Sequence, residues 1–320
     1  MFTVAVVGAG GMGRTHLNNL QKMEDVKIDS ICDPNPDASA LARDVQAAYY
    51  ADLDDMLRNT EAQIVIICTP TFLHTRQIEA VLRSGRHCIS EKPLCLSSRQ
   101  AEELFGLARE KQVQLYVGQV LHFCPEYQIL AEIIQSGRYG KVIDAFFYRL
   151  TEKPKWSAGS WLFDSHKSGL IPYDLHIHEL DFIVSQFGKP CGAHLHEAAR
   201  EDRRREHCRF LYTYNDLTVC AEASWYNAPI PFTQGYRLCF ERAVVVLENK
   251  SVTVYENGTD GGKVLMVAGG DDNGTKINGT SSLPYQDEIA HFLRCAAENR
   301  ASDIVKNETI LAVLETLESV

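Results

Sequence analysis

The fold is decided by residues 2–13, which read Phe2-Thr3-Val4-Ala5-Val6-Val7-Gly8-Ala9-Gly10-Gly11-Met12-Gly13. Residues 2–7 form a nearly continuous apolar run, which is typical of a parallel strand covered on both faces. The run stops at glycines in G-x-G-x-x-G spacing, and a helix is predicted from about Gly11 to Met23. A strand, a glycine turn and a helix in this order begin a βαβ unit.

The glycine loop predicts a pyrophosphate site. Gly8 ends the strand, Gly10 lets the backbone approach the pyrophosphate, and Gly13 allows helix and strand to pack closely, with helix N–H groups directed at the anion. Asp33 ends the next strand, where a carboxylate accepts hydrogen bonds from the ribose hydroxyls and repels a 2′-phosphate. The cofactor predicted is therefore NAD rather than NADP, bound by Gly8, Gly10, Gly11, Met12, Gly13 and Asp33. The alternative is a tight turn with an incidental surface aspartate.

The pattern up to residue 120 alternates strands and helices, which predicts a doubly wound parallel sheet of the Rossmann type. The expected strands are 26–32, 64–68, 87–90 and 113–117, and the expected helices are 38–45, 53–57, 74–84 and 97–111. Beyond Pro125 one helix (126–135) precedes six β-rich segments, at 142–150, 207–214, 217–226, 236–240, 244–247 and 252–255, and two helices close the chain. Short turns such as residues 214–216 imply antiparallel pairing.

Two domains are therefore expected, an α/β domain followed by an α+β domain. Residues 1–120 form the NAD-binding Rossmann domain, and 121–320 form a substrate-binding and oligomerisation domain built on a large, mostly antiparallel open sheet. The polar, glycine-rich stretch 269–282 is expected to be a surface loop.

Composition excludes several classes of partner. The 42 acidic and 32 basic residues give a net charge of −10, so nucleic acid is not expected. No apolar run is long enough to cross a bilayer and no signal peptide fits, so no membrane partner is expected. The ten cysteines form no Cys-x-x-Cys pair, and several lie inside apolar strand-like stretches, which indicates reduced thiols in the cytoplasm.

Two further motifs carry a resemblance to a known family. They are Thr69-Pro70-Thr71-Phe72-Leu73-His74, after the strand at 64–68, and Glu91-Lys92-Pro93-Leu94, after the strand at 87–90. With the glycine loop, they resemble the Gfo/Idh/MocA oxidoreductases, the family of glucose-fructose oxidoreductase and inositol dehydrogenase. The resemblance implies that Thr69, Pro70, His74, Glu91 and Lys92 line the nicotinamide end of the cofactor.

The family's aspartate-histidine signature matches Asp174-Leu175-His176-Ile177-His178, and Asp181 continues it. A spacing of four is expected to put Asp174 and His178 on one face of a helix. Family members often have glycine at the position of His176, so the substrate pocket is where this chain departs most from the pattern. No metal site is expected at His176, His178 and Asp181, because helix positions two apart face different directions and no cysteine or further histidine completes a recognised ligand spacing.

An alcohol gives up hydride only as its hydroxyl proton leaves, so the site needs a base with a pKa near neutrality. The predicted catalytic residues are His178 as the base, Asp174 as its orienting or substrate-binding partner, and Lys92 as a cation near the reacting oxygen. The alternative for each is structural: a solvated lysine, a buried histidine and a helix-capping aspartate. The predicted substrate-binding residues are His122, Arg149, Trp161 and His176.

The function predicted is an NAD-dependent dehydrogenase that acts on a ring hydroxyl of a sugar, sugar derivative or cyclitol. One alternative is a redox-neutral sugar-modifying enzyme with tightly bound, recycled NAD, and another is a non-catalytic NAD(H)-binding regulator. The resemblance also implies a homodimer or homotetramer formed on the open sheet face. The sequence leaves open the substrate, the reaction direction, the release of NAD and whether the Lys92-Pro93 bond is cis.

Overall fold

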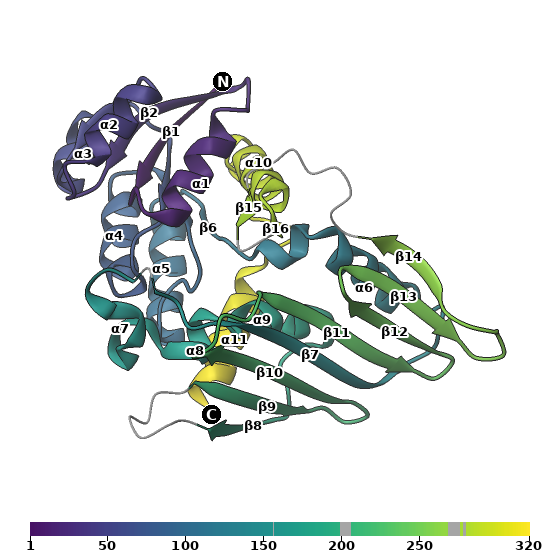
Figure 1. Ribbon diagram of the computed structural model, residues 1–320. Coiled ribbons are helices and arrows are strands. Elements are labelled where there is room, and N and C mark those ends of the chain that lie inside the picture. Colours follow the sequence, from purple (N-terminus) through teal and green to yellow (C-terminus); the bar gives the residue numbers. More distant parts are fainter. Residues whose placement is uncertain (156, 199–205, 268–275, 278–279) are drawn as a thin grey trace. The chain divides into compact units, whose positions relative to one another are not determined.

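The computed structural model describes residues 1–320 except for 156, 199–205, 268–275 and 278–279 (Figure 1). The chain divides into two compact units. The first contains Met1–Val120 and Ser282–Leu311, and the second contains Leu121–Ser281 and Ala312–Val320.

The first unit is built on a six-stranded sheet in which every neighbouring pair is parallel. Its strand order is β3-β2-β1-β4-β5-β6, and the strands are β1 (Phe2–Val7), β2 (Val26–Cys32), β3 (Ala48–Tyr50), β4 (Ile64–Ile67), β5 (His87–Ser90) and β6 (Leu115–Val117). The order reverses between β1 and β4, and such a switch point creates a crevice at the carboxyl ends of the strands. The glycine loop follows β1 directly, so the predicted Rossmann-type sheet is confirmed.

Five helices connect these strands, as the alternating pattern predicted. They are α1 (Gly11–Leu20), α2 (Ala38–Asp44), α3 (Leu53–Asn59), α4 (Thr71–Arg83) and α5 (Ser98–Glu110). Strand β1 is almost completely buried from Val4 to Val7, in keeping with a strand covered on both faces.

The first unit also contains a segment from far along the chain. Helix α10 (Leu283–Ala297) packs beside α1, and Phe292 stacks on Tyr116 of β6 with ring centroids 5.1 Å apart. The Asn19 amide donates a hydrogen bond to the Ser282 carbonyl oxygen at 3.2 Å. The second unit is therefore shorter than the expected range of 121–320, because the apolar face of α10 completes the core of the first unit.

The second unit is built on an eight-stranded sheet, in the order β14-β13-β12-β11-β7-β10-β9-β8. The strands are β7 (Val142–Glu152), β8 (Gly192–Ala198), β9 (His207–Thr213), β10 (Thr218–Tyr226), β11 (Thr233–Phe240), β12 (Ala243–Glu248), β13 (Ser251–Glu256) and β14 (Lys263–Val267). All pairs are antiparallel except β7 with β10. The predicted mostly antiparallel sheet is confirmed, although β8 and β14 were not foreseen.

The two faces of this sheet differ in burial. One cross-strand row is fully buried and consists of Phe210, Ala221, Phe147, Tyr236, Leu247 and Val252. On this side Phe182 of α9 (Ile177–Phe187) lies 6.2 Å from Phe147 between ring centroids. The adjacent row on the opposite face, which includes Leu211, Phe146 and Val246, is only partly buried within the unit.

The remaining elements are short helices and one small ladder. The helices are η1 (Val120–Phe123), α6 (Pro125–Ser136), η2 (Ala158–Phe163), α7 (Ser165–Ser168), α8 (Leu170–Asp174) and α11 (Asn307–Glu318). Most of the predicted loop 269–282 lies outside the described residues, and Lys276–Ile277 (β15) pairs with Thr280–Ser281 (β16). None of the helices in the described part of the chain has the length and apolar character that crossing a membrane requires.

Candidate active site

Two glycines of the phosphate loop are required by the packing of the protein itself. Gly8 has a φ of +92°, and a Cβ there would lie 2.8 Å from the Cys68 carbonyl group. A Cβ on Gly13 would lie 1.9 Å from the Gly8 carbonyl oxygen. By contrast, a Cβ on Gly10 would meet no protein atom within 4 Å. Gly13 thus lets α1 approach the end of β1, and Gly8 lets the loop pack against Cys68 after β4, whereas Gly10 leaves the outer side of the loop open.

The end of β2 is tied to this loop through Asp33. One carboxylate oxygen of Asp33 accepts a hydrogen bond from the Ala9 N–H at 2.7 Å, and the other accepts one from the Asn35 N–H at 2.8 Å. Gly10 is the N-cap of α1, and it makes no side-chain hydrogen bond to the first turn of the helix. An oriented carboxylate beside a helix N-terminus that its own N-cap residue does not cap fits the ribose and pyrophosphate of a dinucleotide.

A buried pair that was not foreseen supports the Glu91-Lys92-Pro93 motif. The His16 Nε2 atom of α1 lies 2.6 Å from Glu91 Oε1, and the second oxygen of Glu91 accepts a hydrogen bond from the Lys92 N–H at 3.3 Å. Burial alone raises the pKa of Glu91, but the hydrogen bond and charge of His16 outweigh it and hold that pKa below its usual range. An ionised Glu91 therefore fixes the backbone that carries Lys92.

His74 joins the second motif to the third. Its Nδ1 atom lies 2.8 Å from the Pro93 carbonyl oxygen and its Nε2 atom lies 2.8 Å from the Thr69 carbonyl oxygen. Burial lowers the pKa of His74 despite these two carbonyl partners. Pro70 is the N-cap of α4, and the Thr69 hydroxyl donates to Gln77. The ends of β4 and β5, which are paired through Ile67 and Ser90, are thereby held together.

Lys92 lies two residues after β5 and is half-buried. The Lys92-Pro93 peptide bond is cis, which answers the question that the sequence left open. Because β5 ends at Ser90, Lys92 lies at the carboxyl end of a parallel strand, where open α/β sheets bind ligands.

In the second unit, Asp174 and His178 do not share one continuous helix, contrary to the expectation. Helix α8 ends at Asp174 and α9 begins at Ile177. Between them the His176 N–H donates to the Ile171 carbonyl oxygen at 2.8 Å, a bond from residue i to i−5. Such a widened turn adds a residue to the helical repeat and is frequent at functional sites. Asp174 and His178 both remain partly exposed, while 175–177 are buried.

His176 is fully buried, which contradicts its predicted place in the lining of a substrate pocket. Its imidazole stacks on Phe210 with ring centroids 3.8 Å apart, and its Nε2 atom shares a hydrogen bond of 2.7 Å with the Tyr212 hydroxyl. Burial, together with the charge of Arg149, lowers the pKa of His176 to about 3. His176 is thus a neutral core residue that anchors the turn between α8 and α9 to β9.

The other three predicted substrate-binding residues have different surroundings. Arg149 is buried, and its guanidinium binds both oxygens of Glu179, with Nε at 2.9 Å from each. His122 lies in η1, and its Nε2 atom is 2.6 Å from Asp181 of α9. Trp161 lies half-buried in η2. The partners Glu179 and Asp181 were not foreseen as site residues, although Asp181 stands in the quoted motif.

The fold and the first-unit site together define a dinucleotide-binding oxidoreductase. A family model described as "Oxidoreductase family, NAD-binding Rossmann fold" matches residues 2–119, and the "GFO/IDH/MocA C-terminal domain" model matches residues 127–246. The chain therefore belongs to the Gfo/Idh/MocA family, and its cofactor is NAD.

The individual relatives described below share less than a third of their aligned residues with this chain. The chain is 29% identical over 187 residues to the inositol 2-dehydrogenase/D-chiro-inositol 3-dehydrogenase of Lactiplantibacillus plantarum, covering 56% of this chain and 50% of that protein. It is 26% identical over 189 residues to the 2,7-anhydro-N-acetylneuraminate hydratase of Escherichia coli, covering 59% and 50%. The chain spans about half the length of these relatives. A levoglucosan dehydrogenase solved with NADH and levoglucosan superposes on this chain with a TM-score of 0.83, and the match covers 99% of this chain and 97% of that one. At 16% identity this similarity shows a shared fold.

Proposed function

We propose that this protein is an NAD-dependent dehydrogenase that acts on a ring hydroxyl of a sugar, a sugar derivative or an inositol-like cyclitol. The observation that carries the proposal is the bracing of Lys92 by Glu91 and His16 at the carboxyl end of β5. A solvated surface lysine needs no buried ion pair beneath its backbone. The names of the inositol and levoglucosan dehydrogenases support a polyol substrate.

The proposed chemistry gives one role to each of three residues. Bound NAD supplies the hydride acceptor, so the protein has to remove the proton of the reacting hydroxyl. His178 is the proposed base, since the side chain is partly exposed and histidine is the side chain that most often transfers protons in enzymes. Asp174 orients that imidazole or binds a neighbouring hydroxyl, and Lys92 stabilises the negative charge that develops on the reacting oxygen.

The test is turnover of purified protein with NAD and a panel of inositols, aldoses and anhydrosugars, followed by NADH absorbance. Lys92→Ala and His178→Asn should each lower kcat by about two orders of magnitude or more. Lys22→Ala is the matched control, because Lys22 is exposed and lies before the amino end of β2. Lys92 lies instead beyond the carboxyl end of β5. Full turnover by Lys92→Ala would refute the assignment.

A second candidate is a redox-neutral reaction in which NAD stays bound and is recycled. It is favoured by one observation, the similarity to a protein named as a hydratase. The two candidates differ in the stoichiometry of cofactor. Retention of NAD through desalting, with product formed and no external NAD consumed, would support the second; readily lost NAD with one NADH per product supports the first.

We also propose that the chain forms a homodimer or homotetramer in the cytoplasm. The partly exposed sheet row of Leu211, Phe146 and Val246 favours contact with a second copy. The ten free cysteines favour a reducing compartment. Light scattering coupled to chromatography should give a mass at least twice 35.9 kDa, and a monomer would contradict the oligomer.

A further inference from the structure

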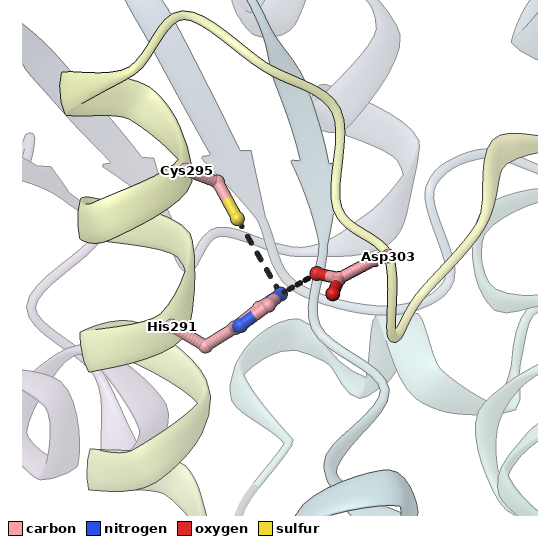
Figure 2. Close-up of side chains that lie close together, drawn as sticks. All are labelled: His291, Cys295 and Asp303. Carbon is pink, nitrogen blue, oxygen red and sulfur yellow. Dashed lines mark hydrogen bonds and ion pairs between the residues drawn. The ribbon is translucent and has the colours of Figure 1, made fainter.

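A cluster of potential metal ligands lies in the first unit, outside the motifs that the proposed function uses. His291 and Cys295 stand four residues apart on α10, and Asp303 comes from the segment that follows the helix. Figure 2 shows the thiol of Cys295 and the carboxylate of Asp303 both directed at the same edge of the His291 imidazole. A spacing of four places two side chains on one helix face, so the third group decides whether they form a site.

The two distances from His291 to the other members of this cluster are close to those between ligands of one tetrahedral ion. The Cys295 Sγ atom lies 3.5 Å from His291 Nε2, and Asp303 Oδ1 lies 3.6 Å from that same nitrogen. Zn–S bonds of about 2.3 Å and Zn–N or Zn–O bonds of about 2.0 Å at the tetrahedral angle separate sulfur from nitrogen by about 3.5 Å and nitrogen from oxygen by about 3.3 Å. All three ligand atoms lie within 4.8 Å of one another, so they can converge on one ion.

Burial and ligand type restrict the kind of ion. His291 and Cys295 are buried, whereas the side chain of Asp303 is 74% exposed, so an ion can enter from the Asp303 side. A thiolate and a carboxylate balance the charge of a divalent cation. Sulfur and imidazole ligands select Zn²⁺ or a similar transition metal over Mg²⁺ and Ca²⁺.

The hydrogen bonds around the cluster hold the ligands in position. The Ser302 hydroxyl accepts from the Val305 N–H at 2.9 Å, and it also lies 2.9 Å from His291 Nε2, a hydrogen bond that an ion on that nitrogen replaces. Arg300 donates to Asp303 Oδ1 at 3.1 Å. A carboxylate has about four lone-pair positions, so Asp303 can keep Arg300 as an outer partner while it binds an ion, as metal-ligating carboxylates commonly do.

We propose that His291 Nε2, Cys295 Sγ and the Asp303 carboxylate bind one divalent transition-metal ion of the zinc class, with water as the fourth ligand. The ion is structural and fixes the segment after α10 to that helix. The sequence predicts no metal site here, because the three ligands follow no recognised spacing and the third is brought in only by the return of the chain after α10.

Cobalt titration of the full, metal-stripped protein tests this proposal, because cobalt replaces zinc and is visible by absorption. One equivalent of Co²⁺ should produce a thiolate-to-cobalt charge-transfer band and the intense visible bands of a tetrahedral ion, and Zn²⁺ should abolish both. Absence of the charge-transfer band in folded protein overturns the proposal. Turnover with NAD is not the readout, so this result is independent of the proposed function.

Three variants locate the site. Cys295→Ser should lose the charge-transfer band, while Cys191→Ser, which removes an exposed thiol in the second unit, should retain it. Asp303→Asn should raise the Kd for Co²⁺ at least about tenfold, the loss that even outer partners of a metal cause. If Cys295→Ser fails to fold by circular dichroism, Asp303→Asn decides, because its position is exposed. An unchanged Kd in Asp303→Asn, or a band that survives in Cys295→Ser, overturns the assignment.

Discussion

Acidification is expected to destabilise the second unit through His176. The imidazole is completely buried against Phe210 and Tyr212, and its pKa falls from 6.5 to about 3 because burial penalises the charged form. The unfolded chain therefore binds more protons than the folded chain between these two values. Stability is consequently lost as the pH falls below about 6.5, and the loss is complete near pH 3.

The size of the effect follows from this shift. Each pH unit inside the window costs about 1.4 kcal/mol, so lowering the pH from about 7.5 to about 5 should remove about 2 kcal/mol of unfolding free energy through His176 alone. His176→Gln keeps a neutral amide that can reach the Tyr212 hydroxyl and removes the titrating group. The variant should be less stable near neutrality, because the stack on Phe210 is lost. Between these two pH values, however, its unfolding free energy should fall by about 2 kcal/mol less than that of the wild type.

Urea unfolding followed by tryptophan fluorescence measures this difference, since Trp161 and Trp225 belong to the second unit and the first unit contains no tryptophan. His194→Gln is the matched control, because His194 is exposed on β8 of the same unit. It should follow the pH dependence of the wild type. Equal losses of free energy in the wild type and in His176→Gln would refute the reasoning.

Three further variants test the packing and charge of both units. Gly13→Ala should lower the stability of the first unit by about 1–3 kcal/mol, because its methyl group would collide with the Gly8 carbonyl oxygen, and an unshifted thermal midpoint would contradict this. Asp33→Ser should raise the Kd for NAD at least about tenfold in calorimetric titration, because the carboxylate that accepts from two backbone N–H groups and from the ribose is lost. Equal weakening of NADP binding would argue against the ribose contact. Glu179→Gln should cost about 3–5 kcal/mol in the tryptophan-monitored urea assay, because Arg149 would keep its charge in a buried site, and unchanged stability would show that the pair is not needed.

The first unit was largely predictable because its signals are local. A buried strand that ends in Gly8 and an aspartate at the end of the next strand specify a turn, a helix start and a ribose acceptor within about thirty residues. The return of α10 to this unit was not predictable. It depends on which apolar surface the helix covers, and an amphipathic pattern states that a face is buried without stating against what.

Some site residues were likewise predictable from local motifs, and others depend on contacts between distant segments. Glu91, Lys92 and His74 were identified from motifs, but the pairing of Glu91 with His16 joins residues 75 positions apart. His176 looked like a second pocket histidine because it stands two residues from His178. The widened turn at 175–176 directs it into the core instead, and no sequence pattern marks that turn.

The sequence by itself determined the parallel sheet, the glycine loop, the preference for NAD and the family motifs, because each depends on residues close together in the chain. Only the tertiary structure decided which polar side chains are buried partners and which stay exposed. It turned Arg149 and His176 from expected substrate contacts into buried groups held by Glu179 and Tyr212. It also brought Asp303 beside His291 and Cys295. Burial and charge pairing arise from contacts between distant segments, which hydrophobic periodicity does not record.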